Sequence, residues 1–110
     1  MIPMRYNPPK KQEQREPRAG DVWLMEDSCP ETGRPFLVPV VVAKADGDSV
    51  EYLETCSEPG PGCHVIRDLA PTGLERNVCI RPAVRRADGR RMRRMVGRLS
   101  RRDLGAVVRR

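Results

Sequence analysis

Arginine is the residue type that best equips this chain to act on another molecule. The segment from Arg85 to Arg110 holds 11 arginines and only two acids, Asp88 and Asp103. The whole chain has 21 lysines and arginines against 15 acids, which gives a formal net charge of +6. Positive charge gathered at one end favours a polyanionic partner, because binding releases counterions from a phosphate backbone. The alternative on composition alone is a solvated, Arg-rich face without a partner.

Four cysteines and one histidine are the other candidates for chemistry. Cys29, Cys56, Cys63 and Cys79 form no CxxC pair, so we expect free, partly buried thiols. A zinc site built from Cys56, Cys63 and His64 is an alternative, although zinc ligands usually have tighter paired spacings. His64 is also a candidate general base, because imidazole exchanges protons near neutral pH.

The length and the N-terminus set the class of protein that we expect. A chain of 110 residues fits one domain. No apolar run approaches the ~20 residues of a membrane-spanning helix, and the N-terminus lacks the apolar core of a secretory signal. We therefore expect a cytoplasmic protein without membrane contact. Residues 1–18 combine four prolines with many charges and predict a flexible arm, which leaves residues 19–110 for the folded domain.

Short β-prone segments recur through the middle of the chain. The predicted strands are residues 21–25, 36–44, 50–55, 64–69 and 77–86. This rhythm predicts a small barrel or sandwich rather than βαβ units. Pro39 lies inside the second strand, and since proline cannot donate to a ladder, we expect an edge strand or a bulge there. The Asp-Gly pair at Asp46 and Gly47 predicts a hairpin turn.

The last part of the chain changes period. Four apolar residues fall at i, i+3, i+4 and i+7, which predicts one face of a helix, with arginines on the other face. These apolar residues are Met92, Met95, Val96 and Leu99. A second short helix should begin after Ser100, because Ser100 and Asp103 resemble a capping box. Its apolar face would be Leu104, Val107 and Val108.

Read in order, these pieces resemble the MazF/PemK family of bacterial toxins. Residues 20–24 (GDVWL) are similar to the first strand of that family, and residues 38–42 (VPVVV) to its apolar strand with an early proline. The third strand ends in a hydroxyl residue, Thr55, as it does in the family. Residues 73–78 (GLERNV) resemble its turn into a later strand, and the tail from Arg91 to Leu104 is the most specific match.

The resemblance implies both a fold and a reaction. The fold would be mainly β with a C-terminal helix, an SH3-like β-barrel of the kind also found in CcdB-type plasmid toxins. The protein would be a homodimer that cuts single-stranded RNA without a metal or cofactor, as the toxin of a type II toxin–antitoxin pair. Its second partner would be an acidic antitoxin. Transfer of the phosphodiester to the neighbouring 2′-OH requires groups that stabilise charge at phosphorus and move protons.

The resemblance also implies the site residues. The catalytic arginine of the family precedes the proline of the second strand, where this chain has Val38, so Arg34 in the preceding loop is the expected substitute. Thr55 would hold the scissile phosphate, and the alternative is a strand-end residue that bonds backbone. The residues expected to bind RNA are Ser57, Arg81, Arg85 and Arg86. If no arginine replaces Val38, the alternative is a degenerate module that binds RNA or an antitoxin without cleaving.

Overall fold

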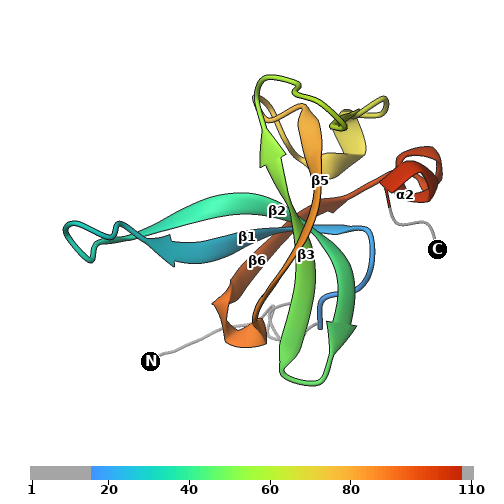
Figure 1. Cartoon of the computed structure of the whole chain (residues 1–110). Helices are drawn as coiled ribbons and strands as arrows, with labels where there is room; N and C mark the ends of the chain where they lie inside the picture. The colour runs from blue at the N-terminus through green and yellow to red at the C-terminus, as the bar shows by residue number, and fades with distance from the viewer. Residues whose placement is uncertain (1–15, 108–110) are drawn as a thin grey trace, which may run out of the picture.

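The described part of the protein is one antiparallel sheet with a short helix at its end (Figure 1). The computed structural model describes residues 16–107, so most of the arm predicted for residues 1–18 lies outside the described residues. The strands are β1 (Asp21–Ser28), β2 (Pro35–Asp46), β3 (Ser49–Cys56), β4 (His64–Val65), β5 (Cys79–Asp88) and β6 (Met92–Arg98). The helix is α2 (Arg101–Val107), and two 3₁₀ turns are η1 (Ala70–Thr72) and η2 (Gly89–Arg91).

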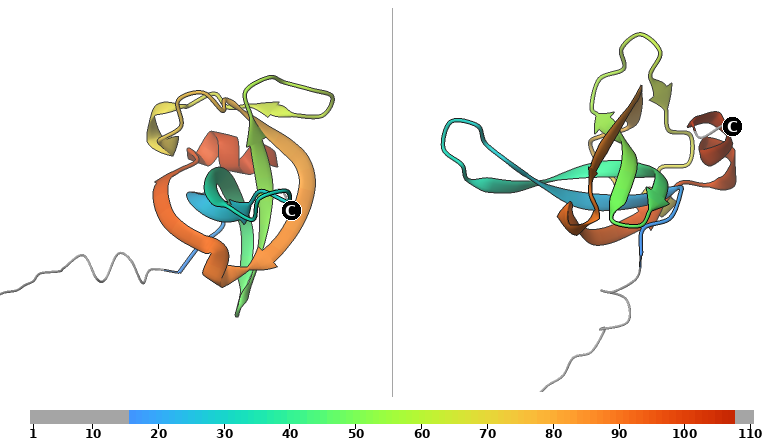
Figure 2. Two further views of the ribbon diagram at one scale, coloured as in Figure 1. Left: turned by 90° about the vertical axis from the view of Figure 1, so that its left-hand side faces the viewer. Right: turned by 60° about the horizontal axis from the view of Figure 1, so that its bottom comes forward.

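The six strands are hydrogen-bonded in the order β4-β5-β3-β2-β1-β6. The mainly β architecture with a C-terminal helix is therefore confirmed. The sheet is not closed into a barrel: in the described residues, β4 and β6 are its edges and no ladder joins them. The sheet is nevertheless strongly curled (Figure 2). As a result β5 and β6, which lie far apart in the strand order, are linked directly through η2.

Two hairpins build the centre of the sheet. Asp46 faces Ser49 across Gly47 and Asp48, and Gly47 has a φ of 63°, a left-handed conformation that favours glycine. The predicted turn between the second and third strands is thus confirmed. The β1–β2 hairpin extends to the pair Ser28 and Pro35, and its tip projects away from the rest of the domain (Figure 1).

Alternating side chains give the sheet an apolar cluster on each face. The Trp23 cluster consists of Trp23, Met25, Val40, Val42, Val50, Tyr52, Ala87 and Met92, with Val38 and Met95 packed against it. The Ile80 cluster consists of Val22, Val41, Leu53, Ile66, Ile80 and Leu99. Side chains that flank η1 (Leu69 and Leu74) and side chains of α2 (Leu104 and Val107) cover this second cluster. Successive residues of a strand point to opposite faces, so the same strands supply both clusters.

The helix predicted from Met92 to Leu99 is wrong, because this segment is strand β6. Met25 faces Met92 and Leu24 faces Arg94, so Arg93 is an extra residue in the ladder. Such a bulge lets residues three apart point to the same face. Met92 and Met95 therefore both reach the Trp23 cluster, and the spacing that indicated a helix comes from an irregular strand.

Pro39 is accommodated differently from the prediction. β2 lies between β1 and β3, so it is not an edge strand, and its bulge falls between Val42 and Lys44. The β2–β3 ladder ends at the pair Val40 and Glu54, and Val40 is the residue after Pro39, so Pro39 itself has no partner in β3. The Pro39 carbonyl points toward β3, where it accepts from the Thr55 hydroxyl. In an antiparallel strand the nitrogen and the carbonyl of one residue point toward the same neighbouring strand, so the nitrogen of Pro39 also points toward β3. The ladder has already ended there, so the N–H that proline lacks is not needed.

The second predicted helix is confirmed as α2, although it ends at Val107 and Val108 lies outside the described residues. The backbone N–H of Asp103 donates to Ser100 Oγ at 3.2 Å, as a capping residue requires. Leu104 and Val107 pack against the Ile80 cluster. No helix in the described range has the length and apolar composition needed to span a membrane.

Candidate nucleic-acid interface

Thr55 lies at the end of β3 with its hydroxyl in two hydrogen bonds. The hydroxyl donates to the Pro39 carbonyl at 2.8 Å and accepts from the Asn77 side-chain amide at 2.9 Å. A hydroxyl has one proton, and here it is directed at the Pro39 carbonyl. Thr55 therefore fastens the end of β3 to β2 and to the segment before β5, and it can donate to a phosphate only if the bond to Pro39 opens.

Arg34 is exposed in the loop of the β1–β2 hairpin. Its backbone N–H donates to Thr32 Oγ1 at 3.2 Å, and its carbonyl accepts from the Cys29 N–H at 2.9 Å. Pro39, which Thr55 contacts, lies five residues further along β2, about 16 Å away at the rise of a strand. Within one copy of the chain, the structure does not bring Arg34 and Thr55 together.

Position 38, where the resemblance to the MazF/PemK family implies an arginine, packs against an apolar cluster. Val38 has Met25 as its strand partner, is half-buried and packs against the Trp23 cluster. An arginine at this position would have to leave that cluster to reach a phosphate. The structure therefore gives an apolar packing reason for Val38.

The four residues expected to bind RNA have different surroundings. Arg85 pairs with Glu54 at 3.4 Å, and Arg86 pairs with Glu51 at 2.9 Å, each across the β3–β5 ladder. Arg81 is exposed and has no ion pair with the described residues. Ser57 is exposed directly after β3. Arg81 and Ser57 thus lie near Thr55 in the fold, whereas Arg85 and Arg86 are partly neutralised.

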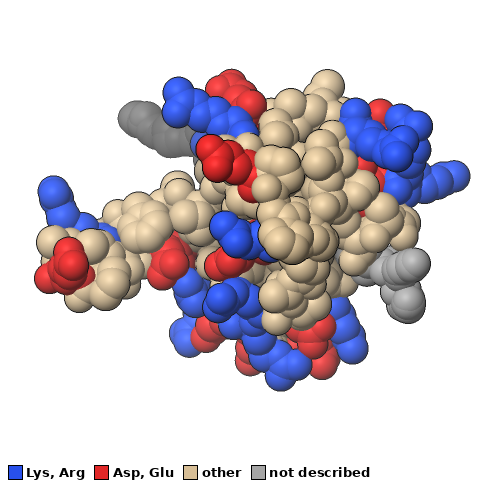
Figure 3. Space-filling model, turned by 45° about the horizontal axis from the view of Figure 1, so that its top comes forward, with Lys and Arg blue, Asp and Glu red and all other residues tan. Residues whose placement is uncertain are grey.

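The arginine-rich tail is largely paired with acids from elsewhere in the sheet. Seven of the nine arginines from Arg85 to Arg102 form ion pairs. The shortest involving β6 joins Arg98 Nη1 to the buried carboxylate of Asp21 at 2.8 Å. Figure 3 shows acids interleaved with lysines and arginines on one face. The tail is therefore less of an open cationic strip than its sequence indicates.

Three exposed arginines without an ion pair among the described residues stand on segments that the sheet register or a hydrogen bond links to Thr55, although Arg81, next to Ile80 in β5, points its side chain to the opposite face of the sheet from Thr55. Arg81 follows Ile80, the strand partner of Thr55, and Arg76 precedes Asn77, which donates to the Thr55 hydroxyl. Arg94 lies in the same row of the sheet as Thr55. It pairs with Leu24 of β1, Leu24 pairs with Pro39 of β2, and the Pro39 carbonyl accepts from Thr55. All three are exposed; we call Arg76, Arg81 and Arg94 the Thr55 arginines.

Sequence reasoning missed Arg76, Asn77 and Arg94 as site residues. Arg94 was assigned to the polar face of a helix, and only the strand register places it beside Leu24. Arg76 and Asn77 stand in a loop, where no periodic pattern relates them to β3. Exposed arginines on separate segments can each contact a different phosphate of an RNA strand.

His64 is held by a buried carboxylate instead of facing a substrate. Its Nε2 lies 2.7 Å from Oδ1 of Asp103, whose side chain is fully buried. Burial alone would raise the pKa of Asp103, but N–H groups of Arg67 and Asp68, with His64 and Ser100, lower the pKa to about 2. The ionised carboxylate only accepts, so Nε2 must donate. Ser100 bonds Asp68 and Asp103 rather than His64, so the group is a clamp between α2 and residues 64–68 and not a nucleophile with its base.

The zinc alternative finds no support in the described residues. They contain no group of three or more His, Cys, Asp or Glu side chains placed to hold a metal ion. The four cysteines are free thiols, as predicted, with Cys56 and Cys79 buried and Cys29 and Cys63 half-buried.

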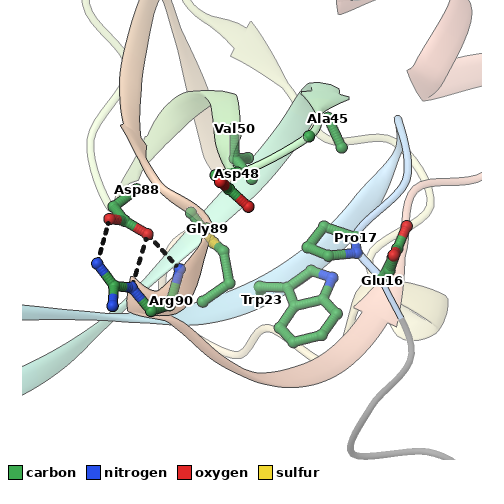
Figure 4. A pocket seen from close by; sticks show the side chains of 11 residues that line it. Glu16, Pro17, Trp23, Ala45, Asp48, Val50, Asp88, Gly89 and Arg90 are labelled. Atoms are coloured by element: carbon green, nitrogen blue, oxygen red, sulfur yellow. Dashed lines mark hydrogen bonds and ion pairs between the residues drawn. The ribbon is translucent and has the colours of Figure 1, made fainter.

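A cavity of about 550 Å³ opens next to Trp23 (Figure 4). Trp23, Pro17 and Met92 supply apolar lining, and Asp48 and Asp88 lie among the acidic residues that line it. The indole N–H of Trp23 already donates to Asp21 Oδ2 at 3.3 Å, so it does not serve a ligand. Arg90 also lines the cavity but is paired with Asp88 at 3.1 Å, so the lining is net negative and disfavours a phosphate ligand.

Comparison with known proteins gives no match: no family model, no curated protein and no solved structure is similar to this chain. The described residues define a small antiparallel β protein in which exposed arginines without an ion pair stand on segments linked to the end of β3.

Proposed function

We propose that this protein is a MazF/PemK-type module with an SH3-like fold that binds single-stranded RNA at the end of β3. The curled antiparallel sheet and its C-terminal helix support the fold. The observation that carries the binding proposal is the arrangement of the Thr55 arginines, which are exposed and without ion pairs among the described residues. The planar guanidinium group of arginine can bind a phosphate with two hydrogen bonds. Thr55 on β3 and Arg94 on β6 are three strand spacings apart, which is about 14 Å.

Binding without cleavage is the form of this function that the geometry favours. The Thr55 proton is directed at the Pro39 carbonyl, and Val38 packs against the Trp23 cluster. Arg34 stands at the far end of β2. Removal of one group that stabilises transition-state charge typically lowers the rate about 100- to 1,000-fold. Efficient cleavage would need Arg34 from a second copy, as the proposed homodimer would supply.

The same arginines would also meet an acidic antitoxin. An acidic peptide and an RNA strand present similar negative charge, so they would compete for the surface around Thr55. The proposal therefore places the protein in a toxin–antitoxin system, as a toxin-like module in which RNA binding is retained and cleavage is reduced.

The test is an RNA-binding titration in EDTA at several salt concentrations. For the native protein, we expect affinity for a labelled single-stranded RNA to fall steeply with salt, by about 0.7 log units per log unit of salt for each phosphate contact. The variant with Arg76, Arg81 and Arg94 changed to Ala should lose about 2 units of this slope. The matched control changes the ion-paired Arg85, Arg86 and Arg90 to Ala and should lose less than about 0.7.

Two outcomes would overturn the binding proposal. One is a salt response that is flat in the native protein. The other is an equal loss of slope in the two triple variants, which would mean that net charge alone attracts RNA. Gel analysis of the same RNA after incubation in EDTA measures cleavage separately, and rapid cutting would contradict the preference for binding alone.

A further inference from the structure

Three of the four cysteines come together where β3 ends and β5 begins. Cys56 is the last residue of β3, and its strand partner is Cys79, the first residue of β5. On its other side Cys79 pairs with Val65 of β4, and Cys63 precedes this short strand by one residue. Cys63 and Val65 are two apart, so their side chains leave the chain on the same face as Cys56 and Cys79.

The thiols differ in how exposed they are. Cys56 and Cys79 are buried, whereas Cys63 is half-buried. Burial and the neighbouring thiols of Cys63 and Cys79 raise the pKa of Cys56. Cys63 is therefore the thiol that a reagent in solution meets first, and Cys56 is the thiol beside it.

The loop between Cys56 and Cys63 is short, rich in proline and glycine, and outside the strand ladders. Its sequence is Ser-Glu-Pro-Gly-Pro-Gly, and it closes through a turn in which the Cys63 N–H donates to the Gly60 carbonyl at 3.1 Å. Gly62 has a left-handed φ of 77°, and a Cβ added there would lie 3.3 Å from Cγ of Pro82. The loop therefore runs over β5 with Cys63 outside the strand ladders, so Cys63 can move toward Cys56 without breaking the sheet.

We propose that Cys56 and Cys63 are an oxidation site that forms a reversible disulfide with a small-molecule disulfide as oxidant. The Cys63 thiolate attacks one sulfur of the reagent, a mixed disulfide forms, and the first small thiolate leaves. The Cys56 thiolate then attacks Sγ of Cys63 and displaces the second small thiolate. The protein loses two electrons and two protons, and the reagent becomes two thiols.

This pairing is favoured over a Cys56–Cys79 bond. Cys79 is fully buried inside a strand ladder, so a reagent in solution cannot reach its thiol. Cys29 stands in the β1–β2 hairpin loop, away from the three. The bond would lock residues 57–62 beside Thr55, and the proposal does not depend on RNA binding.

The experiment treats the full native chain with glutathione disulfide, blocks free thiols, and maps tryptic peptides without reduction. Cys56 and Cys63 share the peptide of residues 45–67, while Cys79 lies in residues 77–85. We expect the 45–67 peptide to lose two hydrogen atoms and to regain them after dithiothreitol. The Cys79→Ala and Cys29→Ser variants should react at the native rate, and Cys63→Ser should leave Cys56 reduced.

Three results would overturn the proposal. These are a link between the two peptides, a stable glutathione adduct on Cys63 with Cys56 free, and no reaction of either thiol. Circular dichroism of each variant shows whether it is folded. Because Cys63 is half-buried in a loop, the Cys63→Ser protein provides the test even if replacement of a buried cysteine disturbs the fold.

Discussion

Asp103 should control the acid stability of this domain. Its buried carboxylate accepts from the N–H groups of Arg67 and Asp68, at 3.0 and 2.9 Å, and lies 2.7 Å from His64 Nε2. With the pKa lowered from 3.8 to about 2, the folded state prefers the ionised form. Its contribution to stability is therefore complete above pH 4 and is lost as the pH falls to 2. Its size is about 2 kcal/mol, from 1.4 kcal/mol per pKa unit.

The Asp103→Asn variant isolates this contribution. An amide cannot accept from all of these donors, so we expect the free energy of unfolding of the variant at pH 6 to be about 3 kcal/mol lower than that of the native protein. The difference from the native protein should shrink by about 2 kcal/mol between pH 5 and pH 2. The assay is urea unfolding followed by circular dichroism. The matched control is Asp27→Asn, which removes an exposed partner of Arg91 and should change the free energy of unfolding by less than about 1 kcal/mol. A difference that stays constant between pH 5 and pH 2 would refute the reasoning.

Three further variants test the packing around the site by urea unfolding. Gly97→Ala should lower the free energy of unfolding by about 2–3 kcal/mol, because the added Cβ would lie 2.4 Å from the Thr72 carbonyl. Its control, Gly105→Ala in α2, adds a Cβ in open space and should raise the free energy of unfolding by about 0.5 kcal/mol. Similar values for the two variants would contradict the packing described for Gly97. Thr55→Val should cost about 1 kcal/mol through its lost hydrogen bonds, and no change would mean that those bonds contribute nothing. Val38→Arg should cost about 1–2 kcal/mol without producing RNA cleavage; strong cutting in EDTA would show that only the arginine was missing.

Local sequence patterns predicted the regular parts of this fold well. β1, β2, β3 and β5 lie where β-branched runs stand between turn residues, because strand propensity and turn chemistry act over a few residues. The cap at Ser100 was also visible, since a capping box is local. In the segment predicted as a strand over residues 64–69, only His64–Val65 pairs with β5.

Features that depend on register were not predictable from the sequence. The extra residues in β6 turned a strand into an apparent helical pattern, and a bulge is visible only once the partner strand is known. The ion pairs that neutralise the tail follow the same rule, since Glu51 and Glu54 reach Arg86 and Arg85 only through the β3–β5 ladder. The composition gives the number of charged residues, but it does not show which of them form ion pairs. The roles expected for the site residues stay predictions, namely those of Arg34, Thr55, Ser57, Arg81, Arg85 and Arg86.

The surface around Thr55 is central to the proposed RNA binding, and an NMR titration with a short single-stranded RNA tests it most directly. The amide signals of Asn77, Arg81 and Arg94 should shift first and together with those at the end of β3. Signals beside the acidic cavity at Trp23 should stay in place. Shifts confined to that cavity or to the ion-paired arginines, or no shifts at low salt, would contradict the proposed RNA site.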